Sequence, residues 1–189
     1  MIAFWEEKLR GEACILPSLE YFNPYFHSLA NPHSLLTTPG SNPLEVCKAV
    51  VQCKMKSGRY RTSLLARHWT PKNPSGHCLA PTCRETPETL EHLLISCPYY
   101  YTTRVTLVKL WTQQPRPVLQ TLLLTLLAGP ASQLLEFILD PAAHPQTIHL
   151  CQTFNHDQDI LKIFCHLTRT WCFSIHKERL KLLKMWNFQ

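Results

Sequence analysis

The sequence is short of glycine and aspartate, and this scarcity excludes several kinds of site. Five glycines and three aspartates occur in 189 residues. No glycine-rich motif that could cradle a phosphate occurs in the sequence. No two aspartates are adjacent, and no sequence motif of a catalytic nucleophile is found. The sequence therefore predicts no phosphate-binding loop and no nucleophile motif, while its spacing still leaves a Ser-His-Asp or Cys-His arrangement open.

Long apolar runs and a secretory leader are also missing. No stretch reaches the roughly 18 consecutive apolar residues that predict a membrane-spanning helix. The nearest candidate, residues 117–129, is closed by Gly129-Pro130 and predicts a buried core helix instead. The N-terminus, MIAFWEEKLRGEACILP, has no basic segment followed by an apolar one, so we expect no signal peptide. We expect an intracellular protein of the nucleus, the cytoplasm or both, which is not secreted and has no membrane partner.

Proline is plentiful, and together with the apolar spacing it predicts a series of short helices. One helix is expected to begin at Pro43, where Asn42 can cap it, and to end at Gly58. The last helix is the longest, because residues 159–186 contain neither proline nor glycine and carry an apolar stripe. Further helices are expected at about 62–68, 105–111, 118–128 and 132–139.

Three cysteines and one histidine have the spacing of a metal site. Cys78, Cys83, His92 and Cys97 follow the pattern C-x4-C-x8-H-x4-C. Zinc prefers thiolate and imidazole ligands and takes four of them in a tetrahedron. The spacing therefore predicts one Zn2+ ion, with ordinary buried cysteines beside a capped surface helix as the alternative. Because four ligands close the site, we interpret it as structural rather than catalytic. His77 is an alternative ligand beside Cys78.

The sequence from Cys78 to Cys97, which we call the knuckle, also predicts local structure. Thr86 can cap a short helix that begins at Pro87 and carries His92. Cys97 is five residues further on, which places it off the face of an α-helix that holds His92. The helix therefore has to loosen before Cys97 if both residues bind one ion.

These elements divide the chain into three consecutive segments. Residues 1–43 are expected to form a proline-rich N-terminal linker with a short helix. Residues 44–101 hold basic helices and the zinc knuckle, and residues 102–189 form a helical C-terminal region. The predicted fold class is mostly α, with short helices around a small C-C-H-C zinc knuckle, followed by a helical C-terminal region with one long terminal helix.

A basic stretch precedes the knuckle. No acidic residue occurs between Glu45 and Glu85, whereas eight lysines and arginines do. Cations neutralise phosphates, and aromatic rings stack on unpaired bases. A solvated helix face with the aromatic residues in the core is an equally consistent interpretation. The candidate nucleic-acid contacts are Lys54, Lys56, Arg59, Tyr60, Arg61, Arg67 and Trp69.

Four sequence blocks, in this order, resemble one known family. They are SGRYRTSLLARHW, CLAPTCRETPETLEHLLISCP, FILDP and LTRTWCFSIHKERLKLL. Over roughly residues 44–186 the chain looks like the C-terminal region of LINE-type non-LTR retrotransposon polyproteins, downstream of their reverse transcriptase domain. The resemblance implies the same four zinc ligands. It also implies a module that holds template RNA or target DNA during reverse transcription.

One departure from that family removes its catalytic activity. The family's polymerase holds magnesium with two carboxylates in an F/Y-x-D-D box, and this sequence has no such pair. We therefore expect no enzymatic activity, and the chain looks like a fragment, a truncated copy or a host-retained tail. The first function hypothesis is a zinc module that binds single-stranded RNA or DNA. The second is a zinc-stapled structural or protein-interaction module, and a non-functional retroelement remnant is the third.

Overall fold

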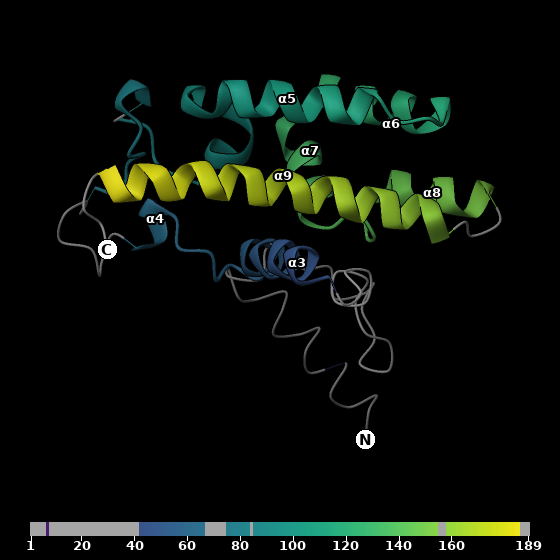
Figure 1. The fold of residues 1–189 in the computed structure, drawn as a ribbon, viewed down its shortest axis with the longest axis horizontal. Helices are drawn as coiled ribbons and strands as arrows, with labels where there is room; N and C mark the ends of the chain where they lie inside the picture. The colour runs from purple at the N-terminus through teal and green to yellow at the C-terminus, as the bar shows by residue number, and fades with distance from the viewer. Residues whose placement is uncertain (1–6, 8–41, 67–74, 84, 155–157, 186–189) are drawn as a thin grey trace. The chain divides into compact units, whose positions relative to one another are not determined.

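The computed structural model describes residue 7 and residues 42–66, 75–83, 85–154 and 158–185, and these are mostly helical (Figure 1). Among the described residues there is no strand, and one isolated antiparallel bridge joins His77 to Pro87. The predicted fold class is confirmed. The α-helices are α3 (Pro43–Lys56), α4 (Ser63–Ala66), α5 (Tyr101–Thr112), α6 (Pro117–Ala128), α7 (Ala131–Leu139), α8 (Pro145–Thr153) and α9 (Gln158–Met185).

The chain forms two compact units, each discontinuous in sequence. Unit 1 contains residues 1–60 and 136–170, and unit 2 contains residues 61–135 and 171–189. Helices α7 and α9 therefore each contribute residues to both units. This grouping cuts across the consecutive segments expected from the sequence, because helices that are distant in sequence pack together. Most of the expected linker, residues 1–43, lies outside the described residues.

In unit 1, α3 begins and ends where the sequence predicts. Its N-cap residue, Asn42, accepts a hydrogen bond from the backbone N–H of Leu44 at 3.0 Å. Pro43 occupies the first helical position, where its missing N–H costs nothing. After the last turn, Gly58 has a φ of 65°, which glycine adopts without strain. Both helix ends are therefore set by local sequence.

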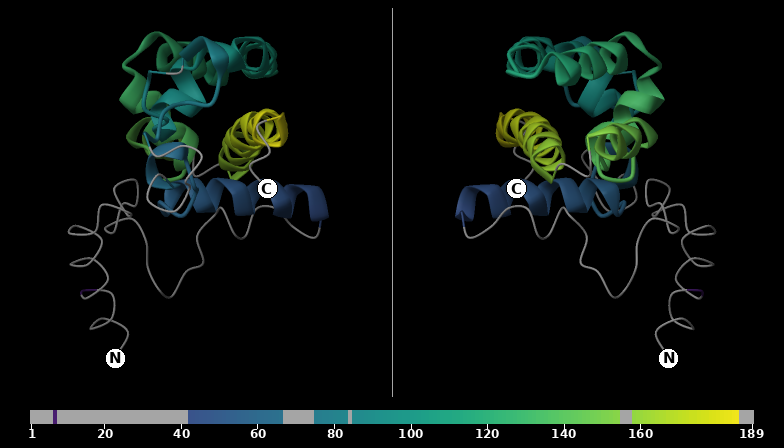
Figure 2. Two further views of the ribbon diagram at one scale, coloured as in Figure 1. Left: turned by 90° about the vertical axis from the view of Figure 1, so that its left-hand side faces the viewer. Right: turned by 90° about the vertical axis from the view of Figure 1, so that its right-hand side faces the viewer.

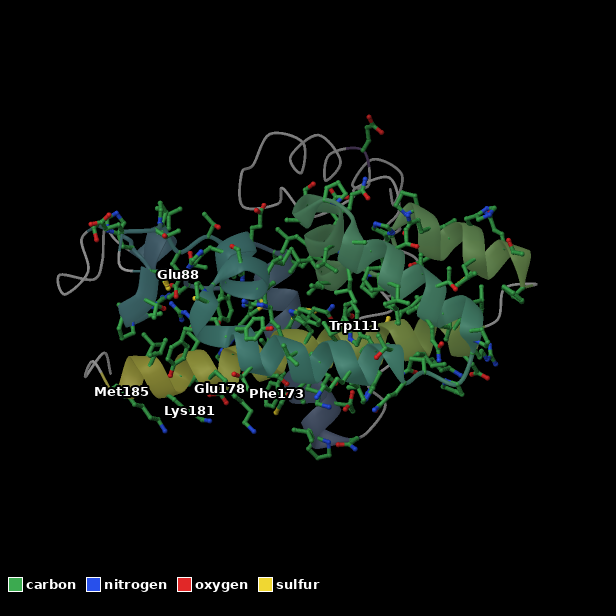
Figure 3. The ribbon with its side chains drawn as sticks, turned by 90° about the horizontal axis from the view of Figure 1, so that it is seen from above. Glu88, Trp111, Phe173, Glu178, Lys181 and Met185 are labelled. Atoms are coloured by element: carbon green, nitrogen blue, oxygen red, sulfur yellow. The ribbon has the colours of Figure 1, made fainter. Side chains whose placement is uncertain are left out.

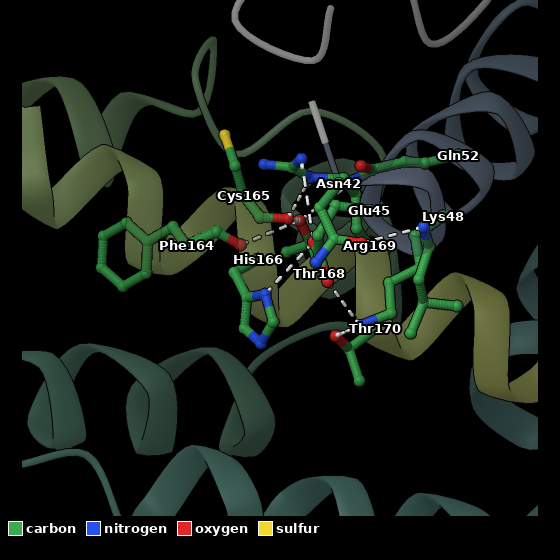
Figure 4. Close-up of polar contacts among 11 residues, drawn as sticks. Asn42, Glu45, Lys48, Gln52, Phe164, Cys165, His166, Thr168, Arg169 and Thr170 are labelled. Atoms are coloured by element: carbon green, nitrogen blue, oxygen red, sulfur yellow. Dashed lines mark hydrogen bonds and ion pairs between the residues drawn. The ribbon is translucent and has the colours of Figure 1, made fainter. Parts of the chain in front are cut away.

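The side chain of Gln52 lies in a buried polar seam between α3 and other helices of unit 1. Its Nε2 donates hydrogen bonds to the carbonyl of Ile138 at 2.5 Å and to Oγ1 of Thr168 at 3.0 Å (Figure 4). α3 crosses this part of α9 at a steep angle. In Figure 1, α9 lies lengthwise and α3 is seen nearly end-on, whereas Figure 2 shows α3 lengthwise. These two bonds hold α3 in this crossing, because a buried N–H group without an acceptor would be costly, although Oε1 of Gln52 is buried without a partner among the described residues.

A buried ion pair anchors the C-terminal end of α3. The Nζ of Lys56 donates to Oδ2 of Asp140, and both side chains are 6% exposed. Burial lowers the pKa of Lys56, although the carboxylate of Asp140 opposes that shift. Each charge therefore depends on its partner, since an isolated ion in the interior is far more costly than the pair.

Unit 2 has a core of leucine and tryptophan. The rings of Trp111 on α5 and Trp171 on α9 are buried, with their centroids 4.7 Å apart. Helix α6 buries Leu119, Leu123 and Leu126, which lie on one helical face. The apolar segment 117–129 is thus a core helix, as predicted. In the part of the chain that the structure describes, no helix has the length and apolar character needed to cross a membrane.

Replacing Asp140 with alanine is expected to lower the free energy of unfolding by about 3–5 kcal/mol, because Lys56 would keep a buried charge without its partner. Asp159→Ala is the matched control, since its carboxylate meets Lys162 at 3.0 Å on an exposed surface. Such exposed pairs contribute about 0–1 kcal/mol. Urea unfolding followed by circular dichroism measures both. Equal losses in the two variants would contradict a structural role for the buried pair.

Candidate metal centre

The first two cysteines of the knuckle lie on a tight loop closed by backbone hydrogen bonds. The N–H of Cys78 donates to the carbonyl of Thr86 at 2.8 Å, and the N–H of Cys83 donates to the carbonyl of Ala80 at 3.1 Å. A single 3-10 turn, Pro81–Cys83, carries the second cysteine. The loop therefore turns both thiols to the same side.

Gly76 allows the chain to enter this loop. Its φ is 70°, in the region that favours glycine. A Cβ at this position would lie 2.8 Å from the Cα of Leu64 and 3.3 Å from the carbonyl oxygen of Ser63. The backbone of Gly76 thus passes close to α4, and its carbonyl accepts a hydrogen bond from the N–H of Glu88 at 3.1 Å. A larger residue here would displace the loop.

The knuckle helix begins later than its sequence predicts. Thr89, and not Thr86, caps it, because Oγ1 of Thr89 accepts from the N–H of His92 at 3.0 Å. The carbonyl of Thr86 is already engaged by Cys78, and Pro87 lies in the bridge to His77. These backbone contacts across the loop hold Thr86 and Pro87 outside the helix, although both are local signals for a helix start.

A single π-turn, His92–Ser96, ends the knuckle helix. The N–H of Cys97 donates to the carbonyl of His92 at 2.7 Å, so the hydrogen bond joins residues five apart. In an α-helix, residues five apart point about 140° away from each other. The wider turn brings them close to one face, and π-turns are frequent at functional sites. The expected loosening of the helix therefore takes this form.

The four predicted ligands meet inside unit 2. The sulfurs of Cys78, Cys83 and Cys97 and a ring nitrogen of His92 lie within 4.8 Å of one another, and all four side chains are buried. The sulfur of Cys97 is 3.8 Å from that of Cys78 and 3.6 Å from that of Cys83. These separations are too long for a disulfide, but they match the roughly 3.8 Å edge of a tetrahedron with metal–sulfur bonds of about 2.3 Å.

His92 has a ring nitrogen that no hydrogen bond occupies in the described part of the chain. The Nε2 of His92 is buried and has no hydrogen-bond partner among the described residues. Buried polar atoms are nearly always paired, so an unpaired imidazole nitrogen beside three sulfurs indicates a position that binds a metal ion. Together the four residues form a donor set that can hold a metal ion.

The thiols favour a cation at this site. Hydrogen bonds from the thiols of Cys78 and Cys83 lower the pKa of Cys97 to about 5. The same contact with Cys97 raises the pKa of Cys78. One negative charge is therefore already stable at neutral pH, and a bound cation would favour ionisation of the other two thiols.

Two side chains outside the ligand set hold the end of the knuckle helix. The Nη2 of Arg104, on α5, donates to the carbonyl of Cys97 at 2.6 Å. The indole Nε1 of Trp171, on α9, donates to the carbonyl of Leu94 at 3.1 Å. The α-helical partner of that carbonyl would be residue 98, which is Pro98 and has no N–H. Trp171 therefore satisfies a carbonyl that the proline leaves unpaired.

A buried carboxylate clamps the middle of the knuckle. Glu88, labelled in Figure 3, accepts two hydrogen bonds from Arg179, at 3.0 and 2.8 Å, and a third from the N–H of Ser63. Burial raises the pKa of Glu88, but the hydrogen bonds and charge of Arg179 outweigh it, and the pKa lies below its usual range. The sequence does not predict this clamp, because Arg179 lies 91 positions from Glu88 along the chain.

The predicted nucleic-acid contacts are placed differently from one another. Lys54, Arg59 and Arg61 are exposed. Lys56 and Tyr60 are not on the surface, since each is 5% exposed and Lys56 is paired with Asp140. Lys56 and Tyr60 therefore belong to the protein interior and not to a nucleic-acid-binding surface. Arg67 and Trp69 lie outside the described residues.

Comparisons with known proteins give no relative. No family model matches the chain, and neither the curated proteins nor the solved structures contain a match to it.

Trp171→Phe is expected to lower the free energy of unfolding by about 1–3 kcal/mol, because the buried carbonyl of Leu94 would lose its donor. The same variant should release bound metal to a chelator more readily than the unchanged protein. Trp111→Phe is the matched control, as it trims a buried indole of the same cluster but leaves that hydrogen bond intact. Chelator competition and thermal unfolding measure the two effects. If the two variants hold metal equally well, Trp171 does not support the metal centre.

Proposed function

We propose that this protein is a structural zinc module that binds single-stranded nucleic acid without catalysing a reaction. The observation that carries the zinc assignment is the closed cluster of three sulfurs and one unpaired imidazole nitrogen. Thiolate and imidazole in a tetrahedral arrangement select zinc over the hard cations magnesium and calcium, which prefer oxygen.

A structural role is favoured over a catalytic one. Catalytic zinc sites keep one position for water and place a general base nearby. Here four protein donors fill the tetrahedron. The buried carboxylate of Glu88 is held by Arg179 and Ser63, so it is engaged in packing and not poised as a base. Zinc would instead join the cysteine loop to the knuckle helix, and so to α5 and α9 through Arg104 and Trp171.

Nucleic-acid binding is supported by charge and by the resemblance to the retrotransposon tail. Lys54, Arg59 and Arg61 are exposed in a stretch that has no acidic residue. Such cations bind phosphates without reading sequence. The competing function is a zinc-stapled protein-interaction module, which shares the metal centre but not the affinity for nucleic acid. The third hypothesis is a non-functional retroelement remnant, which would have no binding partner.

Purified protein is expected to contain one zinc ion per chain, measured by elemental analysis. Cys83→Ser should abolish stoichiometric zinc and loosen unit 2. Cys47→Ser is the matched control, because Cys47 is an exposed cysteine on α3. The metal should leave as the pH falls, since protons compete for thiolates and imidazole. Zinc-free protein that keeps its full stability would contradict the metal assignment.

Single-stranded oligonucleotides are expected to bind weakly, with little sequence preference and a steep salt dependence. Each phosphate neutralised on a single strand adds about −0.7 to the slope of log affinity against log salt. Lys54, Arg59 and Arg61 together should therefore contribute a slope of about −2. Fluorescence anisotropy across a salt series measures this, and Arg59→Ala with Arg61→Ala should flatten it. Without any binding at low salt, the interaction-module hypothesis is favoured instead.

A further inference from the structure

An open groove of about 280 Å³ runs between α5 and the C-terminal part of α9, within unit 2. Hydroxyl groups dominate its polar lining. The residues that matter here are Thr102, Thr103 and Thr106 from α5 and Ser174, Lys177 and Glu178 from α9. None of them belongs to the metal centre or to the basic stretch before the knuckle.

The groove has unused hydrogen-bond donors, and its lysine is not neutralised by its glutamate, which pairs with a lysine outside the lining. Lys177 is exposed and forms no ion pair with any described residue. The one acidic group, Glu178, is neutralised by Lys181 at 2.7 Å (Figure 3). The hydroxyls of Thr102 and Thr103 have no partner among the described residues. Hydroxyls and an ammonium group are the side chains that commonly contact nucleic-acid phosphates.

Two exposed tyrosines come just before the groove residues of α5 in the sequence, one at the first position of α5 and one in the 3-10 turn before it. Tyr101 is 66% exposed and Tyr99 is 37% exposed, whereas Tyr100 between them is buried. The first turn of α5 has no acidic residue and no side-chain cap. An exposed aromatic ring beside a cationic groove is the arrangement that binds single strands by stacking.

We propose that this groove holds the sugar–phosphate backbone of a single strand of nucleic acid, with a base stacked on Tyr101. The proposal rests on the nucleic-acid binding proposed above and gives it a surface that the basic stretch does not provide. Lys177 contacts a phosphate, and the hydroxyls of Thr102 and Thr103 donate to phosphate oxygens. RNA and DNA share this backbone chemistry, so oligonucleotides of both kinds are the probes.

The metal centre holds this surface in place. Tyr101 follows the ligand Cys97 by four residues, and Arg104 ties the first turn of α5 to the carbonyl of Cys97. The start of α5 is therefore tied to the last ligand of the knuckle. Chelation of the metal should accordingly weaken binding in the groove.

The test is anisotropy with oligouridylate and oligodeoxythymidylate on the metal-loaded full chain. Tyr101→Ala should weaken binding about fivefold or more, the loss expected from one stacked base. Lys177→Ala should reduce the salt slope by about 0.7. Lys162→Ala is the matched control, an exposed lysine on the same helix that is paired with Asp159. It should leave the affinity and slope nearly unchanged.

The outcomes separate this proposal from the proposed function. If Tyr101→Ala and Lys177→Ala bind like the unchanged protein while Arg59→Ala with Arg61→Ala bind weakly, the groove is overturned and the nucleic-acid function stands. No binding by the unchanged protein overturns both. Equal affinity for a polyglutamate peptide of the same charge would show a general anion surface, which also overturns the groove as a nucleic-acid site.

Discussion

The π-turn at the end of the knuckle helix is the constraint on which unit 2 depends. The hydrogen bond from the N–H of Cys97 to the carbonyl of His92 brings two ligands together that an α-helix would separate. Pro98 then leaves the carbonyl of Leu94 without a backbone donor, and the indole of Trp171 supplies one. The candidate metal ligands and the tryptophan core are therefore joined through a single turn of backbone.

Electrostatics in both units follows the same rule, that a buried charge is kept only beside its partner. With a divalent ion bound, three thiolates would leave one excess negative charge, and the guanidinium of Arg104 donates to the carbonyl of Cys97 nearby. Glu88 has Arg179, and in unit 1 Lys56 has Asp140. Such a pair adds little stability over well-packed apolar residues of the same volume, but the loss of one partner alone is costly.

Capping residues and apolar periodicity in the sequence correctly predicted the helix ends and helices that depend on neighbouring residues. Asn42, Pro43 and Gly58 set the ends of α3, and the apolar periodicity gave α6 and α9. Helix α8 was missed, although Pro145 at its first position is a start signal, because its apolar pattern is weak. The same limit explains Lys56, which lies in a basic stretch of the sequence and whose partner Asp140 is 84 positions away. Contacts of that range leave no trace in spacing.

The central claim is that three sulfurs and one nitrogen close around one zinc ion. X-ray absorption at the zinc edge of the metal-loaded protein measures the ligand shell directly. The account predicts three sulfurs at about 2.3 Å and one nitrogen at about 2.0 Å, with no oxygen ligand. A shell with two sulfurs or fewer, or with a water oxygen in place of the imidazole, would contradict a closed structural site.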